Sequence, residues 1–160
     1  MPTLSKVNLE SYISGYVDGE GSFCVSIRPR KGNIVGWEVV ASFSVAQNED
    51  RAEVLRLIKN YFQCGFIRRN VTDKTLKYET RSLDNLVKKI IPHFERYPLQ
   101  SGRQKDFEIF RKVCQKMSRG EHLTKKGLIE IIQLVSKMNP SGRRRYSKTA
   151  ILNSLSKMKI

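Results

Sequence analysis

The sequence predicts an α+β fold in which two β-hairpins and several helices form a single domain, residues 1–160. Two observations lead to this prediction. Stretches whose apolar residues recur every three or four positions alternate with stretches in which every second residue is apolar, and these are the periods of helices and strands. The strands come in adjacent pairs without a lasting strand–helix–strand alternation, which favours an antiparallel sheet over a parallel one.

The first helix and the first hairpin are expected within residues 8–45. Apolar side chains recur at helical spacing over residues 9–17, and Asn8 precedes them as an N-cap. Apolar and polar side chains alternate over residues 23–28 and again over 37–45. The connection "RPRKGNIVG" is rich in turn residues, so we expect an antiparallel hairpin with a long basic tip.

A second helix and a second hairpin follow. Asp50 and Glu53 resemble a capping box, and a helical stripe covers residues 54–62. The stretch "FIRRNVTDKTLKYET", residues 66–80, predicts two strands with a turn near residues 72 and 73. The side chains of this hairpin expected to face the core are Ile67, Leu76 and Tyr78.

Helices complete the chain. Apolar stripes at helical spacing cover residues 83–91, ending before Pro92, then residues 107–117 and 128–138, and a last one holds Ile151, Leu155 and Met158. The expected order of elements is α-ββ-α-ββ-α-α-α. Helices on one face of the four strands leave the other face free. A solvated face explains its polar residues as well as a binding face does.

Thirty Lys and Arg against fifteen Asp and Glu leave a formal charge of +15. Such a surplus is self-repelling unless a polyanion neutralises it, so nucleic acid is the first candidate partner and a membrane surface the second. No run approaches the roughly 20 apolar residues that span a bilayer, and the N-terminus lacks the plan of a secretory signal. Three distant cysteines indicate a reducing compartment without a zinc site. We therefore expect a soluble intracellular protein.

Two carboxylates, Asp18 and Glu20, lie among glycines where the first helix meets the first strand. Gly15 and Gly19, expected on the apolar helix face with Ile13, would let a second copy of the helix approach closely. Two Glu20 side chains would then meet near a twofold axis and repel unless a divalent cation lay between them. "DGEG" alone is more often an acidic turn. In front of a basic sheet, however, carboxylates can hold a hard cation against a phosphodiester.

Residues 13–21, "ISGYVDGEG", resemble the nine-residue signature of the LAGLIDADG homing endonucleases, with Ser14 where alanine is usual and Glu20 in place of the commoner aspartate. The order of elements and the segments "QNEDR", residues 47–51, and "YPL", residues 97–99, extend the resemblance over essentially the whole chain. It implies a four-stranded antiparallel saddle-like sheet with helices packed on one face. Only one copy of the motif is present, and one-motif members are homodimers that act on nearly palindromic sites.

The resemblance implies an intron-encoded, site-specific endonuclease that hydrolyses both strands of DNA and leaves 3′ overhangs. Glu20 and the carbonyl of Gly19 would bind Mg²⁺, and Mn²⁺ or Ca²⁺ could occupy the same site. Gln47 and Arg51 would be auxiliary catalytic residues, joined by a basic residue after "YPL" for which we prefer Arg103 to Lys105. The implied dimer interface comprises Tyr12, Gly15, Tyr16, Asp18 and Gly19, with Asp18 at the helix end or in the dimer seam. Double-stranded DNA and a second copy are the expected partners, without a membrane or a small-molecule cofactor.

Recognition would place the polar strand face in the major groove. Arginines there suit guanine, Asn70 suits adenine and Glu38 suits cytosine. The hairpin tip would reach the outer bases, and the loop of residues 139–148 would contact phosphates. The implied DNA-binding residues are Ser26, Arg28, Arg30, Lys31, Asn33, Glu38, Val40, Ser42, Ser44, Arg68, Asn70, Lys77, Arg143, Arg144, Arg145 and Lys148.

Two other functions remain open on the same fold. One is an RNA-binding splicing factor, or maturase, that does not cut, and the other is a DNA-binding regulator without a metal site. Retention of Glu20, Gln47 and Arg51 favours the nuclease. His93 and His122 have no acidic or cysteine partner at a sensible spacing and are expected to be structural or on the surface. The compartment is either a bacterial cytoplasm or an organelle.

Overall fold

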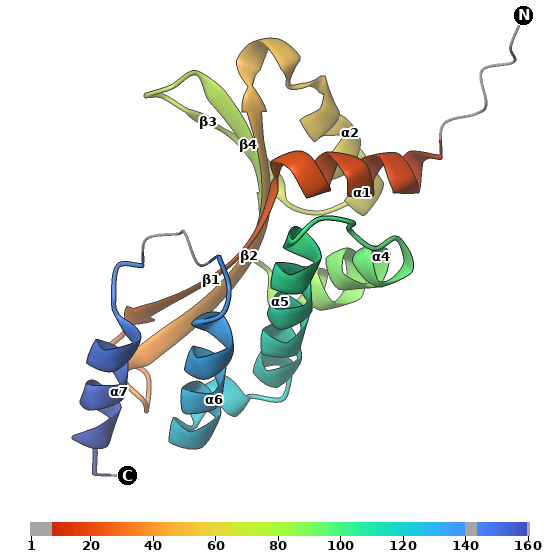
Figure 1. Cartoon of the computed structure of the whole chain (residues 1–160). Coiled ribbons are helices and arrows are strands. Elements are labelled where there is room, and N and C mark those ends of the chain that lie inside the picture. Colours follow the sequence, from red (N-terminus) through yellow and green to blue (C-terminus); the bar gives the residue numbers. More distant parts are fainter. Residues whose placement is uncertain (1–7, 140–143, 160) are drawn as a thin grey trace, which may run out of the picture. The chain divides into compact units, whose positions relative to one another are not determined.

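The computed structural model describes residues 8–139 and 144–159. Its elements follow the predicted α+β order, except that among the described residues four main helical stretches follow the second hairpin where the predicted order had three (Figure 1). The first half contains α1 (Leu9–Glu20), β1 (Gly21–Pro29), β2 (Trp37–Asn48), the 3-10 turn η1 (Glu49–Arg51), α2 (Glu53–Phe62), β3 (Phe66–Asn70) and β4 (Thr75–Thr80). The second half contains α3 (Leu83–Asn85), the π-helical turn η2 (Leu86–Ile90), α4 (Ile91–Arg96), α5 (Arg103–Ser118), the 3-10 turn η3 (Glu121–Leu123), α6 (Lys125–Val135) and α7 (Lys148–Ser156).

The four strands form one sheet in the order β1-β2-β4-β3. The pairing of β4 with both β2 and β3 is antiparallel, with Val45 opposite Tyr78 and Arg68 opposite Lys77. Opposite residues of antiparallel strands share a face. The buried side chains of Val45 and Tyr78 therefore mark the core face, while Arg68 and Lys77 lie on the other face. This arrangement confirms the predicted antiparallel sheet and its polar side.

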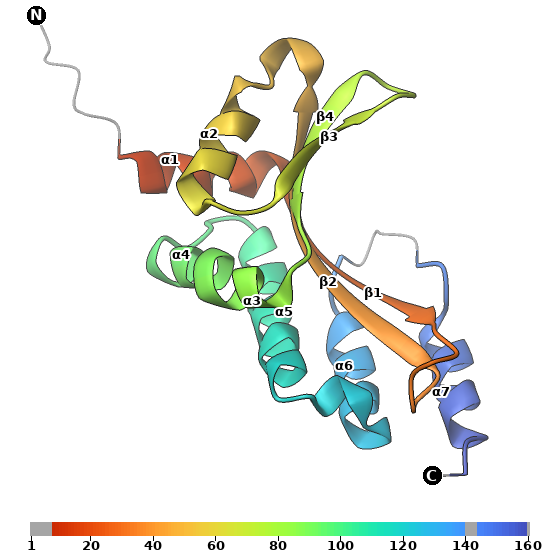
Figure 2. The same ribbon diagram turned by 180° about the vertical axis from the view of Figure 1, so that it is seen from behind.

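The chain packs as two compact units. Unit 1 comprises residues 1–22 and 43–104, and unit 2 comprises residues 23–42 and 105–160, so that β2 runs from one unit into the other. In unit 1, helices α1, α2 and α4 lie on one side of β3 and β4 in both views (Figures 1 and 2). In unit 2, helices α5 and α6 lie side by side in both views. Within the described ranges, no helix is long and apolar enough to cross a membrane.

Aromatic side chains form the core of unit 1. Phe43 of β2 is fully buried and makes edge-to-face contacts with three other rings. The centre of its ring lies 6.1 Å from that of Phe62, 6.2 Å from that of Tyr78 and 5.5 Å from that of Phe94. Such pairs add about 0.5–1.5 kcal/mol each beyond the burial of their area. Because the four rings come from β2, α2, β4 and α4, they fix the helices of this unit to its strands.

Unit 2 is held together by a similar cluster. The ring centre of Phe23 on β1 lies 5.3 Å from that of Phe107 and 5.2 Å from that of Phe110, and both of these residues are on α5. The rings of Trp37 on β2 and Tyr146 pack edge to face, with their centres 5.4 Å apart. The Nε1–H of Trp37 donates to the hydroxyl of Ser154 on α7 at 3.3 Å. The first hairpin is thus packed against α5 and α7.

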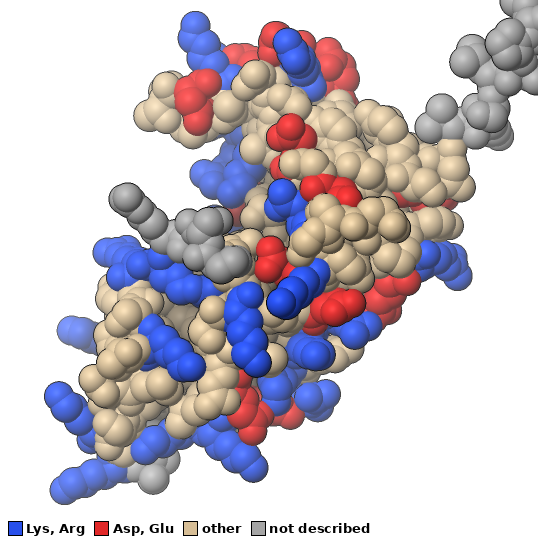
Figure 3. Space-filling view, viewed as in Figure 1, with Lys and Arg blue, Asp and Glu red and all other residues tan. Residues whose placement is uncertain are grey.

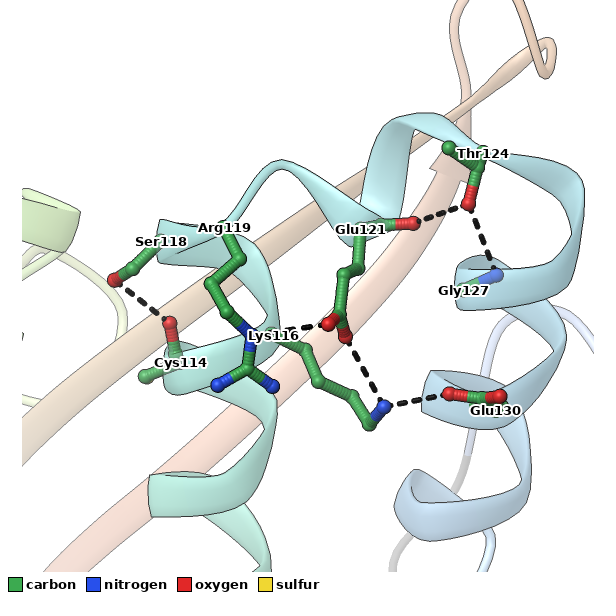
Figure 4. Close-up of polar contacts among 8 residues, drawn as sticks. All are labelled: Cys114, Lys116, Ser118, Arg119, Glu121, Thr124, Gly127 and Glu130. Carbon is green, nitrogen blue, oxygen red and sulfur yellow. Dashed lines mark hydrogen bonds and ion pairs between the residues drawn. The ribbon is translucent and has the colours of Figure 1, made fainter.

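Ion pairs and a close main-chain contact fix the connection between α5 and α6 (Figure 4). Lys116 donates to Glu121 at 3.1 Å and to Glu130 at 2.6 Å, while Arg119 donates to Glu121 at 2.9 Å. A Cβ added to Gly127 would lie 1.9 Å from the main-chain oxygen of Glu121. Glycine at position 127 therefore allows the main chain of η3 to approach α6 closely.

Two predicted helix boundaries are wrong. The capping box of Asp50 is not formed, because Glu49–Arg51 is a 3-10 turn and α2 begins after Ala52 without a side-chain cap. Glu49 explains this difference: its N–H donates to Lys74 O at 3.1 Å and its carboxylate accepts from Arg69 at 2.9 Å. The chain is thereby held at the second hairpin until just before α2.

The second boundary is at Pro92. The helical stretch does not end before this proline but continues through α4 to Arg96. The π-helical turn of residues 86–90 precedes it, with the N–H of Ile91 bonded to Leu86 O. Pro92 then occupies the first turn of α4, where the missing N–H of proline is tolerated.

Candidate functional site

Helix α1 has one buried side and one open side. Asn8 caps it as predicted, accepting the N–H of Ser11 at 2.7 Å, and Ile13 and Val17 are fully buried. A Cβ added to Gly15 or Gly19 would meet nothing within 4 Å. The expectation that these glycines share the face of Ile13 is therefore wrong, since side chains two positions apart point about 200° apart around a helix.

The open side of α1 carries the residues expected at a dimer interface. We call Tyr12, Gly15, Tyr16 and Gly19 the α1 stripe. Tyr12 is 44% exposed, both glycines are exposed, and Tyr16 is partly buried. The stripe is therefore accessible to another molecule along most of its length.

The end of α1 places Glu20 at the surface. Glu20 is the last residue of the helix, is exposed, and is followed at once by β1. Gly21 makes this junction possible, because a Cβ there would lie 2.5 Å from the side chain of Val17 and 2.8 Å from its main-chain oxygen. The N–H of Gly21 bonds to that same oxygen and closes the helix.

Asp18 anchors α1 to the segment before α5. Its carboxylate accepts the N–H of Gln100 at 3.1 Å, the N–H of Ser101 at 3.0 Å and the hydroxyl of Ser101. Partial burial works against the charged form, but these hydrogen bonds and the charge of Arg103 outweigh it and hold the pKa of Asp18 below its usual range. Within unit 1, Asp18 therefore has the helix-end role that was one of the two predicted.

Two of the predicted auxiliary residues contact α1. Arg103 donates from Nε to the main-chain oxygen of Asp18 at 3.0 Å, and Gln47 donates from Nε2 to the hydroxyl of Tyr16 at 2.6 Å. Residues 16 and 18 belong to the last turn before Glu20. The structure thus brings Arg103 and Gln47 to the helix end that carries the acidic motif.

Arg51 is placed differently. Its side chain is 76% exposed and lies 3.8 Å from the carboxylate of Asp50, its neighbour in η1. Among the described residues, no hydrogen bond joins it to Glu20, Gln47 or Arg103. Its expected catalytic role remains a prediction.

In unit 2, the polar face of the first hairpin is organised around Glu38. Its carboxylate accepts from Arg28 at 2.7 Å and also from Arg30. The hydrogen bond from Arg28 is the main reason why the pKa of Glu38 lies below its usual range, and Arg30 adds to the effect. Arg28 and Arg30, which were expected to read separate bases, are therefore both bonded to Glu38, which was expected to read a third. At the tip, Asn33 donates to Trp37 O at 2.8 Å.

In unit 1, the polar face of the second hairpin is organised around Glu79, which sequence reasoning missed together with Arg81. Glu79 is 2% exposed, and Arg68, Lys77 and Arg81 lie within 3.6, 3.3 and 3.2 Å of its carboxylate. The alternation along β4 could have found both residues, because positions 77, 79 and 81 share one face of an extended strand.

Asn70 also differs from the expectation that it is free for adenine. Its amide donates to Asp73 at 3.0 Å, and its carbonyl oxygen accepts from the hydroxyl of Thr72 at 2.9 Å. Asp73 in turn accepts from Thr75. These bonds stabilise the turn between β3 and β4, which is the common local use of Asn and Asp.

The basic loop between α6 and α7 is only partly described, since Arg143 lies outside the described residues. Arg144 donates to Met138 O at 2.9 Å and also to Val135 O. It therefore binds carbonyl groups at the C-terminal end of α6, a favourable place for a cation, instead of projecting toward a phosphate. Arg145 lies over the ring of Tyr146 at 5.7 Å, and Lys148 is exposed at the start of α7.

Comparison with known proteins agrees with this geometry. The family model described as LAGLIDADG endonuclease matches residues 13–114. The chain belongs to the LAGLIDADG endonuclease family. It is 31% identical over 150 residues to "Homing endonuclease I-ApeII" of Aeropyrum pernix, covering 90% of this chain and 88% of that protein.

Solved structures of LAGLIDADG proteins show the same fold. "Crystal structure of a homing endonuclease, I-TnaI" matches with a TM-score of 0.80 and 32% identity over 92% of this chain and 95% of that chain. I-LtrWI, described as bound to target DNA, matches with a TM-score of 0.80 and 39% identity over 82% of this chain and 44% of that chain. These matches confirm the predicted fold.

Several LAGLIDADG relatives are much longer than this chain. "Probable intron-encoded endonuclease 2" of Neurospora crassa is 35% identical over 130 residues, which are 81% of this chain but 29% of that protein. For "Probable intron-encoded endonuclease 3" of the same organism the chain covers 24% of the length. The chain thus spans less than a third of the length of each of these two relatives.

The donor groups at the end of α1 suit the divalent cation that the LAGLIDADG resemblance implies. They are oxygens: the exposed carboxylate of Glu20 and the main-chain carbonyl of Gly19, at the helix end where carbonyl dipoles are negative. A hard cation such as Mg²⁺ prefers oxygen ligands and keeps several waters. Within residues 8–139 and 144–159, no group of three or more His, Cys, Asp or Glu side chains lies close enough together to hold a metal.

The positive charge of this LAGLIDADG chain is concentrated in unit 2. That unit has 17 Lys and Arg against 5 Asp and Glu, whereas unit 1 has 13 against 10. Figure 3 agrees, since on the face it shows Lys and Arg crowd over the helices of unit 2. Unit 2 is therefore the more strongly attracted of the two to a polyanion.

A buried network of polar side chains contacts α1, the helix that carries the motif. The side chains of Ser14 and His93 are buried, with 5% and 6% of each residue exposed. The hydroxyl of Ser14 donates to Tyr97 O at 2.6 Å and lies 3.1 Å from His93 Nε2. On the other side of the ring, the Tyr61 hydroxyl lies 2.9 Å from Nδ1. His93 is thus structural, one of the two predicted alternatives, and the serine that replaces the usual alanine of the motif provides a partner for it.

Proposed function

We propose that the chain is a site-specific DNA endonuclease that hydrolyses phosphodiester bonds with Mg²⁺ and acts as a homodimer on a long, nearly palindromic target, leaving 3′ overhangs. One observation carries this proposal. The exposed Glu20 ends the motif helix, and Arg103 and Gln47 contact the same turn of that helix. A carboxylate, a cation and an amide at the end of one helix suit phosphodiester hydrolysis better than simple DNA binding, which has no use for the carboxylate.

Each of these side chains has a role that its chemistry supports. Glu20 and the Gly19 carbonyl would hold the metal ion. When bound, Mg²⁺ supplies a Lewis acid and lowers the pKa of a coordinated water. Arg103 keeps a permanent positive charge beside the helix end, where it can offset the charge that builds up on the phosphate in the transition state. The Gln47 amide can orient a water through its hydrogen bonds.

The proposed dimer uses the α1 stripe. Gly15 and Gly19 leave room for a second helix to approach the backbone, and the exposed ring of Tyr12 offers apolar area beside them. A hollow of about 300 Å³, lined in part by Ser11, Gly15 and Arg96, adjoins this side of α1 and can receive a partner side chain. A second copy would supply a second Glu20 and a second pair of hairpins, which suits a palindromic target.

The proposed DNA surface comprises the polar face of each hairpin, one in each unit. I-LtrWI is described as bound to target DNA, and I-SmaMI as bound to an uncleaved DNA target in the presence of calcium ions. The arginines at Glu38 and at Glu79 suit base edges and phosphates in the major groove. Relatives with "intron-encoded" in their names support a mobile-intron origin, and we propose a bacterial cytoplasm or an organelle as the compartment.

The test is cleavage of a randomised DNA library in Mg²⁺ by the wild-type protein and by Glu20→Gln. We expect the wild type to cut a defined sequence and the variant to lose about 100-fold or more in rate, as is common when a group that stabilises transition-state charge is removed. Glu10→Gln, in the first turn of the same helix, is the matched control and should cut normally. Undiminished cleavage by Glu20→Gln overturns the mechanism. Tight RNA binding without any cleavage by the wild type would favour the maturase instead.

A further inference from the structure

A buried carboxylate lies in the middle of the polar face of the second hairpin. Glu79 on β4 pairs with Ser44 of β2 and Phe66 of β3, so that strands flank it on both sides. Its side chain is 3% exposed, whereas the side chains of Lys77, Arg68 and Arg81 around it are 33%, 53% and 54% exposed. The three cations therefore cover the carboxylate and separate it from solvent.

Fold stability does not explain this carboxylate. Removing an ion from water costs more free energy than ion pairing alone usually returns, unless hydrogen bonds satisfy its oxygens. Glu79 Oε2 makes no hydrogen bond within the described part of the chain. Its contacts there are ion pairs, 3.6 Å to Arg68 and 3.2 Å to Arg81. A glutamate also weakens the attraction of this face for phosphates, so its presence calls for another reason.

We propose that Glu79 is a positioning residue for DNA sequence recognition, which holds Arg68, Lys77 and Arg81 so that they meet base edges in one fixed arrangement. This inference rests on the proposed function and assigns the substrate-reading role of this hairpin to a cluster that includes Arg81. Arg68 faces Glu79 through Nε, the inner nitrogen of its guanidinium group. Its two terminal nitrogens thus remain for a guanine, whose O6 and N7 require a planar, bidentate donor.

Two physical effects make such a cluster selective. Arginine side chains already held by a carboxylate lose less rotamer freedom when they bind, which favours the duplex whose acceptors match their positions. The negative charge of Glu79 opposes binding to phosphates alone, which weakens attachment to the wrong sequence. Glu79 therefore increases the difference between specific and non-specific affinity while it lowers the total positive charge.

The first hairpin has the same arrangement within unit 2. Glu38 accepts from Arg28 at 2.7 Å and also from Arg30, and its side chain is 20% exposed against 59% for each arginine. Each hairpin thus carries one carboxylate that is less exposed than the cations it holds. Its recurrence on a second pair of strands supports a role tied to the polar face and independent of the local packing of β4.

The experiment compares wild type, Glu79→Gln and Glu121→Gln. Glu121 also contacts two cations, Lys116 and Arg119, but in the connection between α5 and α6 of unit 2, so it is the matched control. Binding to the selected target duplex and to a scrambled duplex is measured in EDTA over a range of salt concentrations. For Glu79→Gln we expect the ratio of the two affinities to fall about tenfold or more. Scrambled DNA should bind as well or better, with a salt slope steeper by about one.

The outcomes separate this inference from the function on which it rests. A folded Glu79→Gln protein, judged by circular dichroism, with an unchanged affinity ratio overturns the role of Glu79. A wild-type protein without any preferred sequence contradicts the proposed function, and this inference with it. If Glu79→Gln does not fold, Arg81→Gln provides the second variant. It should lose discrimination at a few adjacent base pairs, and full retention of discrimination overturns the inference.

Discussion

Protonation of His93 provides a perturbation whose size follows from the structure. The imidazole is buried, and its neutral form is fully matched: Nε2–H can donate to Ser14 Oγ at 3.1 Å, because that hydroxyl gives its own proton to Tyr97 O. Nδ1 then accepts from the hydroxyl of Tyr61 at 2.9 Å. Burial lowers the pKa of His93 from 6.5 to about 4, with the carboxylate of Glu10 acting weakly in the opposite direction.

The sign of the pH dependence follows from this shift. Between pH 6.5 and about 4 the unfolded chain takes up a proton that the folded chain does not. The free energy of unfolding is therefore unaffected by His93 above this window and falls as the pH drops through it. A shift of this size corresponds to a loss of about 3 kcal/mol, reached near the lower end of the window.

Urea unfolding of wild type and His93→Gln across this window tests the argument. Glutamine keeps hydrogen-bonding capacity but does not titrate, so the variant should be less stable at neutral pH and show a much flatter decline on acidification. His122→Gln is the comparison variant: burial also lowers the pKa of this partly buried histidine, so this variant should flatten the decline too, but less than His93→Gln, because the pKa shift of His93 is larger. Asp18 and Glu38 have lowered pKa values, so their contributions to stability are lost as the pH falls below the ordinary pKa values of 3.8 and 4.5, at and beyond the acid end of this window. Parallel curves for wild type and His93→Gln would refute the reasoning.

Four further predictions concern other parts of the chain. Gly127→Ala should lower the free energy of unfolding by about 2 kcal/mol or more in urea titrations, because the new Cβ would lie 1.9 Å from the main-chain oxygen of Glu121. Gly102→Ala is the control and should change the free energy of unfolding little, because its Cβ would meet nothing within 4 Å. Gly15→Leu should leave a folded monomer in sedimentation experiments because its Cβ points into open space; a dimer of unchanged affinity would contradict the proposed interface. Arg144→Ala should reduce stability by about 1 kcal/mol through the lost helix-end contacts, with an unchanged salt slope of DNA binding. Lys148→Ala should reduce that slope by about one without affecting stability.

The fold could be predicted because its local signals agree with its tertiary contacts. The apolar positions of α1, β1 and β2 have the period of their element, and the same residues form the core. The boundaries at Asp50 and Pro92 could not be predicted in this way. The first depends on the distant contacts of Glu49 with Lys74 and Arg69, and the second on a wider helical turn that no residue pattern marks.

The candidate site divides along a similar line. The end of α1 was predictable because Glu20 and its glycines are adjacent in sequence. The bonds that occupy Glu38, Asn70 and Arg144 were not, because each depends on where a turn or helix ends. Arg144 reaches the carbonyl groups of α6 only because that helix stops at Val135, before the predicted end of its apolar stripe.

The position of Glu20 is set from one side of α1. Ser14 donates to Tyr97 O, Asp18 accepts from Gln100 and Ser101, and Arg103 donates to Asp18 O, so residues 97–103 hold the helix at two successive turns. The side chains of the α1 stripe take no part in these bonds. The end of the motif helix is therefore fixed within unit 1 alone. In the proposed dimer, a second copy would complete the set of metal ligands without having to order the first Glu20, since the bonds that orient α1 exist before the partner binds.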